Sequence, residues 1–125
     1  MILIYNLSPQ KDAQVKMLCR KMLLQVRSVE KDEYGCTLGY LLGLTDDDTK
    51  EDGEDFDDAM LYMDGVGGML SLFLDQLRRK KIRIPLKAIR TDTNIGFSSY
   101  ELHRELCAER DAIEQNRKAH DTSDS

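Results

Sequence analysis

Seven basic residues lie close together in this sequence with no acidic residue among them, a pattern that favours the binding of anions. They are Arg78, Arg79, Lys80, Lys81, Arg83, Lys87 and Arg90. The stretch 78–81 is predicted to form the last turn of a helix, where the helix macrodipole favours cations, so a structural role also explains these charges. The candidate ligand-binding residues are therefore the later cations and an amide that follows them: Arg83, Lys87, Arg90 and Asn94.

Arg83 and Lys87 have the spacing of two side chains on one face of a strand. At a rise of ~3.3 Å per residue they lie about 13 Å apart, and both could bind phosphate or carboxylate groups. A solvated strand face, or screening by acidic residues elsewhere in the chain, explains the same pattern. Asn94 has a similar alternative, since its side chain can bond its own backbone in a turn. No aromatic side chains alternate with the cations, which argues against single-stranded nucleic acid.

Three other motifs do not meet the requirements of the sites that they suggest. An EF-hand loop beginning at Asp48 would place Lys50 where calcium needs an oxygen ligand. The glycines at 65–68 match neither the dinucleotide nor the P-loop fingerprint, so a tight strand-to-helix turn is the simpler interpretation. His103 and Cys107 share one side of a predicted helix, but two ligands do not make a zinc site. We therefore predict no metal site and no cofactor.

The cysteines indicate reduced thiols rather than disulfides. The chain has three, Cys19, Cys36 and Cys107, an odd number without CxxC spacing. Cys36 precedes a predicted helix start, where the helix dipole would lower its pKa, but no base is placed beside it in the sequence. A buried structural thiol is therefore the favoured interpretation of Cys36. No catalytic residue is identified, which argues against an enzyme.

These candidate residues need a scaffold, and the hydrophobic pattern predicts strand, helix, strand, helix twice. Strands are predicted at 2–5, 24–28, 60–63 and 82–88, and helices after Ser8-Pro9, after Thr37, through 70–77 and after Ser98. Pro85 lacks a backbone donor, so the last strand is predicted to be an edge strand or to contain a bulge. In the second strand of each half, apolar and polar residues alternate. This pattern predicts that helices do not fully cover both faces of the sheet, which leaves a face or an edge free for dimerisation. We predict an α/β fold, a duplicated βαβα two-layer sandwich with a four-stranded, mainly parallel or mixed sheet.

The net charge of −5 on 125 residues conceals two opposite parts. Nine acidic residues and one basic residue lie between Asp46 and Asp58, a local charge of −8 that leaves +3 for the rest of the chain. Such a block repels itself and is predicted to be a solvated, mobile linker between halves 1–45 and 59–113 of one domain. The polar end 114–125 is predicted to fray. The helix before it is expected to bury Leu102, Leu106 and Ile113.

The stretch Met60–Leu106 contains three motifs that point to a known family. They are Ile84-Pro85-Leu86-Lys87-Ala88-Ile89, Thr91-Asp92-Thr93-Asn94 and Ser98-Ser99-Tyr100-Glu101-Leu102. On these residues the chain resembles a bacterial domain family of unknown function, often seen in clostridial proteins. The resemblance implies a bacterial cytoplasmic protein with an α/β fold, and it brings no activity, cofactor or catalytic residue. The apolar stretch 1–7 is too short for a signal peptide or a membrane span, which also favours the cytoplasm and no membrane contact.

Two functions of different classes follow from these observations. The first is a non-enzymatic interaction or regulatory module that forms homo-oligomers or binds a protein partner. The second is a domain that binds an anionic ligand, a nucleotide, phosphate or nucleic acid, through the basic stretch 78–90. A bulk-basic nucleic-acid binder is excluded by the net charge of −5. A thiol enzyme that uses Cys36 ranks third.

Overall fold

The computed structural model describes the backbone of residues 1–123 and the side chains of residues 1–117. Within this part of the chain, strands and α-helices follow in the order β1 Ile2–Tyr5, α1 Pro9–Lys21, β2 Val26–Ser28, α2 Leu38–Leu41, β3 Met60–Met63, α3 Leu70–Arg79, β4 Leu86–Ile89 and α4 Ser99–Ser123. The predicted α/β class is therefore confirmed. The first and third strands have the predicted bounds, and a polar residue, Asn6 or Asp64, follows each apolar run.

The strands form one mixed sheet in the order β2-β1-β3-β4. The two central strands, β1 and β3, are antiparallel, with Ile2 opposite Met63 and Tyr5 opposite Met60. Each outer strand runs parallel to the central strand of its own half. The predicted four-stranded mixed sheet is confirmed, and so is the edge position of the strand that follows Pro85.

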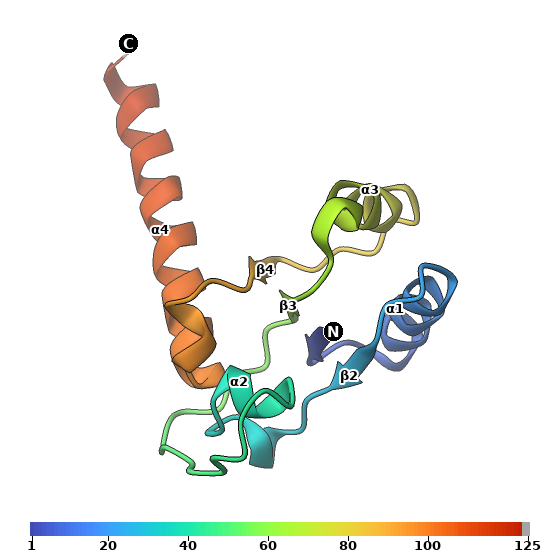
Figure 1. Cartoon of the computed structure of the whole chain (residues 1–125). Helices are drawn as coiled ribbons and strands as arrows, with labels where there is room; N and C mark the ends of the chain where they lie inside the picture. The colour runs from blue at the N-terminus through green and yellow to red at the C-terminus, as the bar shows by residue number, and fades with distance from the viewer. Residues whose placement is uncertain (124–125) are drawn as a thin grey trace.

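Helices pack on both faces of the sheet, so the two-layer arrangement is not confirmed. Figure 1 shows α1 and α3 on one side of the sheet and α2 and α4 on the other. Successive residues of β1 point to opposite faces: Ile2 packs with α1 and α3, while Leu3 packs with α2 and α4. Because the central strands are covered on both faces, they are continuous apolar runs. Apolar and polar residues alternate at 24–28 and 82–88 because these two segments lead into the outer strands, β2 and β4, at the edges of the sheet.

The last strand is shorter than predicted, since β4 begins at Leu86 and not at Ile82. The N–H of Ile82 donates to the carbonyl oxygen of Leu77 at the end of α3, at 2.9 Å. Pro85 has no N–H to donate to a neighbouring strand. Residues 82–85 therefore connect α3 to β4 with alternating buried and exposed side chains but without strand pairing.

The predicted helix starts are confirmed. The Ser8 hydroxyl accepts a hydrogen bond from the N–H of Lys11 at 3.3 Å, with Pro9 at the first helical position. Thr37 caps α2 in the same way. Ser98 accepts from the N–H of Glu101 at 3.1 Å and begins α4. These starts depend on local hydrogen bonds, which explains why residue types alone predict them.

Within the part of α4 whose side chains are described, residues 99–117, only the first turns pack against the rest of the molecule. Leu102 is buried and Leu106 packs against the same core, but Ile113 is 60% exposed, so its predicted burial is wrong. Figure 1 shows that α4 continues past the sheet into solvent. The segment 114–125 is helical as far as Ser123, and residues 124–125 lie outside the described residues. The fraying of this segment stays a prediction. No described helix combines the length and the apolar character needed to cross a membrane.

The acidic segment, residues 46–58, has exposed carboxylates as predicted but is anchored to the fold. Its only buried residue is Phe56, which packs into the core below α2 and α4. The Glu51 N–H donates to the carbonyl oxygen of Gly35 at 3.0 Å, and the Ser98 hydroxyl donates to the Glu51 carboxylate. The Asn6 side chain donates to the carbonyl oxygen of Phe56 at 2.9 Å. The segment thus covers one face of the sheet, and its mobility stays a prediction.

Replacing Gly35 by alanine is expected to lower the free energy of unfolding by about 1–3 kcal/mol. The added Cβ would lie 2.4 Å from the backbone carbonyl oxygen of Glu51, so the acidic segment would have to move away. Urea denaturation measures the change. The control is Gly68→Ala, whose new methyl group meets nothing within 4 Å. Equal stability of the two variants would contradict close docking of the segment against Gly35.

Candidate functional site

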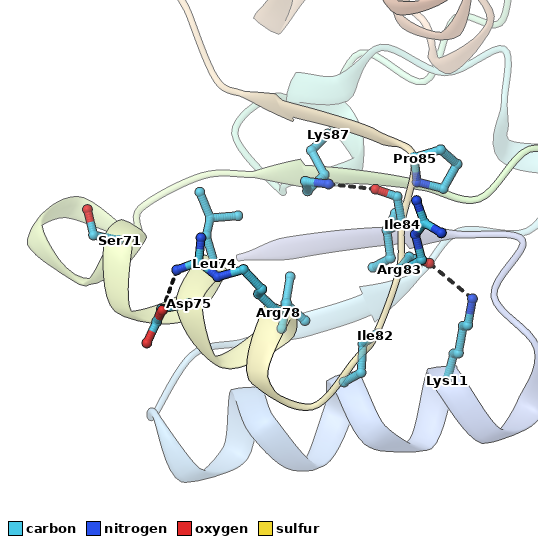
Figure 2. Close-up of a pocket in the computed structure, with 11 residues that line it drawn as sticks. Lys11, Ser71, Leu74, Asp75, Arg78, Ile82, Arg83, Ile84, Pro85 and Lys87 are labelled. Carbon is cyan, nitrogen blue, oxygen red and sulfur yellow. Dashed lines mark hydrogen bonds and ion pairs between the residues drawn. The ribbon is translucent and has the colours of Figure 1, made fainter.

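A groove of about 840 Å³ lies between the start of α1, α3 and the connection from α3 to β4. Figure 2 shows its residues. We call it the basic groove. It is lined by the apolar residues Leu74, Leu77, Ile82, Ile84 and Pro85 and by the polar residues Lys11, Ser71, Asp75, Arg78, Arg83 and Lys87. Four cations and one carboxylate give this lining a net charge of +3.

The apolar floor of the basic groove follows from two periodicities in the sequence. On α3, Leu77 points into the core while Leu74 is half-buried at the groove. After α3, the side chains of Ile82 and Ile84 are buried, at 5% and 2% exposure. The residues that alternate with these buried side chains, Arg83, Pro85 and Lys87, are exposed. Alternation thus places apolar side chains beneath the groove and cations along its border.

Two lysines of the basic groove are held by backbone carbonyl groups. The Lys11 ammonium donates to the carbonyl oxygen of Arg83 at 3.0 Å, and the Lys87 ammonium donates to that of Ile84 at 2.6 Å (Figure 2). Among the side chains that the structure describes, no carboxylate forms an ion pair with Lys11, Arg83 or Lys87. These three cations therefore have charge available for a ligand.

The remaining cations of the stretch 78–81 are partly neutralised, as a helix-end role predicts. Asp75 accepts from Arg78 at 2.5 Å and from Arg79 at 2.9 Å. Because Asp75 also lines the groove, it places one negative charge at the end nearest α3. An anionic ligand is therefore expected to lie nearer Arg83 and Lys87 than Arg78.

The four predicted ligand-binding residues do not meet in one place. Arg83 and Lys87 line the basic groove, whereas Arg90 lines a cavity of about 210 Å³ at the carboxyl ends of β3 and β4. There the Arg90 guanidinium forms an ion pair with Asp64 at 3.1 Å. Asn94 lines another hollow, beside α4, and Lys87 lines this hollow as well as the basic groove. Its binding role stays a prediction, while its hydrogen bonds match the turn-fixing alternative.

Asn94 connects the turn after β4 to the centre of the sheet. Its side-chain oxygen accepts from the Tyr62 hydroxyl at 2.6 Å and from the N–H of Thr91 at 2.8 Å. Its amide nitrogen donates to the carbonyl oxygen of Ile89 at 3.0 Å. All of these partners belong to the protein, so Asn94 has a structural function regardless of any ligand.

Sequence reasoning did not identify Lys11 as part of the site. Lys11 lies in the first turn of α1, and the residue whose carbonyl it contacts is 72 positions later in the chain. No spacing or motif relates two residues at such a separation. Only the packing of α1 beside α3 on the same face of the sheet brings them together.

The alternative explanations for the basic stretch and for Cys36 can also be compared with the structure. The acidic segment pairs with Lys31 and His103. No ion pair among residues 1–117 joins this segment to the basic groove, so no contact supports screening of the groove by the segment. Cys36 is 1% exposed, and burial raises the pKa of its thiol. This finding opposes the alternative of a lowered pKa, and the favoured burial of Cys36 is confirmed.

Comparison with known proteins adds a family without a known role. No curated protein matches the chain, and neither does any solved structure. The matched residues, 63–113, contain α3, β4, the first turns of α4 and three of the four groove cations, Arg78, Arg83 and Lys87. The predicted resemblance is thus confirmed as regards a family of unknown function, while its bacterial source stays a prediction. Over residues 63–113 the chain is similar to the family described as Domain of unknown function (DUF3783).

Proposed function

We propose that this chain is a non-enzymatic interaction module whose basic groove binds an acidic, partly apolar segment of a partner protein. The observation that carries the proposal is the combination of three cations, Lys11, Arg83 and Lys87, with a floor of apolar side chains. None of these cations pairs with a carboxylate of residues 1–117. Carboxylates of a partner would pair with the cations, and its apolar side chains would cover the floor.

The surroundings of the groove favour carboxylates on a peptide over a compact phosphate. The groove runs along α3 from Ser71 to the C-terminal end of the helix, and at that end the helix dipole is negative and carbonyl groups are exposed. Phosphate sites typically use backbone N–H groups at a helix N-terminus, and here the backbone presents the carbonyl oxygens of Arg83 and Ile84. The lining contains no aromatic ring on which a base would stack.

The second candidate is an anionic small molecule, a nucleotide or phosphate, or nucleic acid. The volume of about 840 Å³ favours this candidate, since it lies in the range of small-molecule sites. The same cations, Arg83 and Lys87, would then bind the ligand, with Arg90 and Asn94 outside the groove.

The test measures binding of a fluorescein-labelled peptide of alternating Glu and Leu residues by fluorescence anisotropy. We expect binding that weakens with added salt, and a loss of at least about tenfold in affinity for Arg83→Gln/Lys87→Gln, since hydrogen bonds to charged groups contribute about 1.5–3 kcal/mol each. The matched control is Arg20→Gln. Arg20 is exposed near the other end of α1, nine positions or about 13 Å from Lys11, and its loss should leave affinity unchanged.

Three probes distinguish the candidate ligands in the same assay. Polyglutamate of equal charge should bind more weakly than the Glu-Leu peptide if the apolar floor contributes. Stronger binding of ATP or of an oligonucleotide than of the peptide would replace the proposal with the second candidate. Absence of binding by all of these probes at low salt would contradict both.

Other features of the proposed role also stay predictions: self-association, internal duplication, a cytoplasmic location and a bacterial source. Self-association is supported by the edge strand β4, where Ile89 is 49% exposed. Light scattering that shows only monomer at high protein concentration would contradict it. Duplication is supported by the order strand, helix, parallel strand in both halves.

A further inference from the structure

We propose that Asp58, His103 and Cys107 bind a divalent transition-metal ion of the zinc class. One ligand atom of each residue, a carboxylate oxygen, an imidazole nitrogen and a sulfur, lies within 4.8 Å of the others. This site is separate from the basic groove, since it lies on the opposite face of the sheet, with α4 and the acidic segment. It would tie the acidic segment to α4.

The tertiary structure supplies the third ligand. His103 and Cys107 are one turn apart on α4, as their spacing predicts. Asp58 comes from the end of the acidic segment, which runs beside the first turns of α4 (Figure 1). Three protein ligands and a free position for water are the arrangement of many zinc sites.

The imidazole of His103 is held in place by a stack of rings. It lies parallel to the Phe56 ring, with centroids 4.0 Å apart and planes at 7°. The Phe56 ring in turn stacks on Tyr34 at 4.6 Å. Because Phe56 and Tyr34 are buried, the imidazole has a fixed plane against the core and presents its Nε2 atom towards the other two ligands.

The distances between ligand atoms approach those that a metal ion needs. Bonds of ~2.1 Å to nitrogen and oxygen and ~2.3 Å to sulfur, at tetrahedral angles, require ~3.6 Å between nitrogen and sulfur and ~3.4 Å between nitrogen and oxygen. The Nε2 of His103 lies 3.5 Å from the Cys107 Sγ and 2.7 Å from the Asp58 Oδ2. The carboxylate has to move outwards by a fraction of an ångström, and its side chain, 47% exposed, has room to do so.

The arrangement suits a metal better than a nucleophilic thiol. In a Cys-His-Asp relay the thiol and the carboxylate contact different ring nitrogens, but here Asp58 and Cys107 both contact Nε2. A metal ion would replace these hydrogen bonds with bonds to the same three atoms. The Cys107 thiol would lose its proton to solvent as the sulfur–metal bond forms. Nitrogen, oxygen and sulfur together favour zinc-class ions over magnesium or calcium.

A hollow lined by His103 and Cys107 leaves space for a water ligand and contains charges of both signs. It has a volume of about 490 Å³, and its other charged residues are Glu54, Asp55, Arg104 and Asp111. The Arg110 guanidinium lies 3.9 Å from the Cys107 sulfur and places a positive charge beside it.

The experiment titrates the untagged, reduced full chain with Co²⁺ and follows absorbance, then repeats the titration with Zn²⁺ by calorimetry. We expect one ion per chain, with a sulfur-to-cobalt charge-transfer band and the intense visible bands of tetrahedral Co²⁺. Cys107→Ser should abolish the charge-transfer band. Asp58→Asn and His103→Phe should each weaken binding by at least about tenfold, since even second-shell partners of metal ligands contribute 10–100-fold.

The variants separate a specific site from general attraction of cations to the acidic segment. His103→Phe keeps the ring on Phe56, and thermal unfolding without metal shows whether each variant is folded. The matched control is Asp52→Asn, which removes the same charge from an exposed position of the acidic segment. Asp52→Asn should bind as tightly as the unchanged chain. Equal weakening by Asp52→Asn and Asp58→Asn, binding without a charge-transfer band, or no binding would each overturn the proposal.

Discussion

Replacing Phe56 by alanine is expected to lower the free energy of unfolding by about 3–5 kcal/mol, the usual cost of removing a buried phenylalanine. Phe56 is 6% exposed although its neighbours in the acidic segment are charged and exposed. Its ring packs against Tyr5, Tyr34 and His103. The loss would leave a cavity in the core on this face of the sheet and release the acidic segment. Urea denaturation measures the change.

Leu44→Ala is the control for the Phe56 variant, because Leu44 is a large apolar residue just before the acidic segment and is 54% exposed. Its replacement should change stability by no more than about 0.5 kcal/mol. If Phe56→Ala were equally harmless, the acidic segment would be the freely solvated linker that its charge alone predicts.

Replacing Asn94 by alanine is expected to cost about 2–3 kcal/mol of stability. The variant loses the hydrogen bonds to the Tyr62 hydroxyl, at 2.6 Å, to the N–H of Thr91 and to the carbonyl oxygen of Ile89. Tyr62 is fully buried, and a buried hydroxyl without a partner costs about 1–3 kcal/mol. Thermal or urea unfolding of the variant and the unchanged chain gives the difference.

Two further variants show whether Asn94 acts through Tyr62. Tyr62→Phe removes only the hydroxyl and should cost about 1 kcal/mol, and the double variant should cost less than the sum of the two single changes. Thr93→Ala, at an exposed neighbouring position without a capping hydrogen bond, serves as the control. Unchanged stability of Asn94→Ala together with lost anion binding would favour the predicted ligand role instead.

Local features of the sequence predicted most of the elements. The starts of α1, α2 and α4 follow from the hydroxyl groups of Ser8, Thr37 and Ser98, which bond to backbone N–H groups three positions later. The central strands followed from short apolar runs. Such signals act over a few residues, so they need no knowledge of the rest of the chain.

The arrangement of those elements could not be predicted in the same way. The sheet order depends on pairing between Ile2 and Met63, and the cover of both faces depends on helices from both halves. The alternation of apolar and polar residues in the outer strands predicted a sheet face that helices leave uncovered, but it reflects the position of these strands at the edges of the sheet. The acidic segment shows the same limit, because its charge indicates solvation while the single residue Phe56 docks it onto the core.

The sequence by itself determined the pair Arg83 and Lys87 and the pair His103 and Cys107, because strand and helix periodicity place residues of fixed spacing on one side. Only the tertiary structure decided what completes each pair. It brings Lys11 to the first pair and Asp58 to the second, across 72 and 45 positions of the chain. It also directs Arg90 to Asp64 and Asn94 to Tyr62. The physical reason is that contacts at such separations arise from burial of the apolar faces of α1, α3 and α4 on the sheet, and no local pattern records which polar residues that burial will bring together.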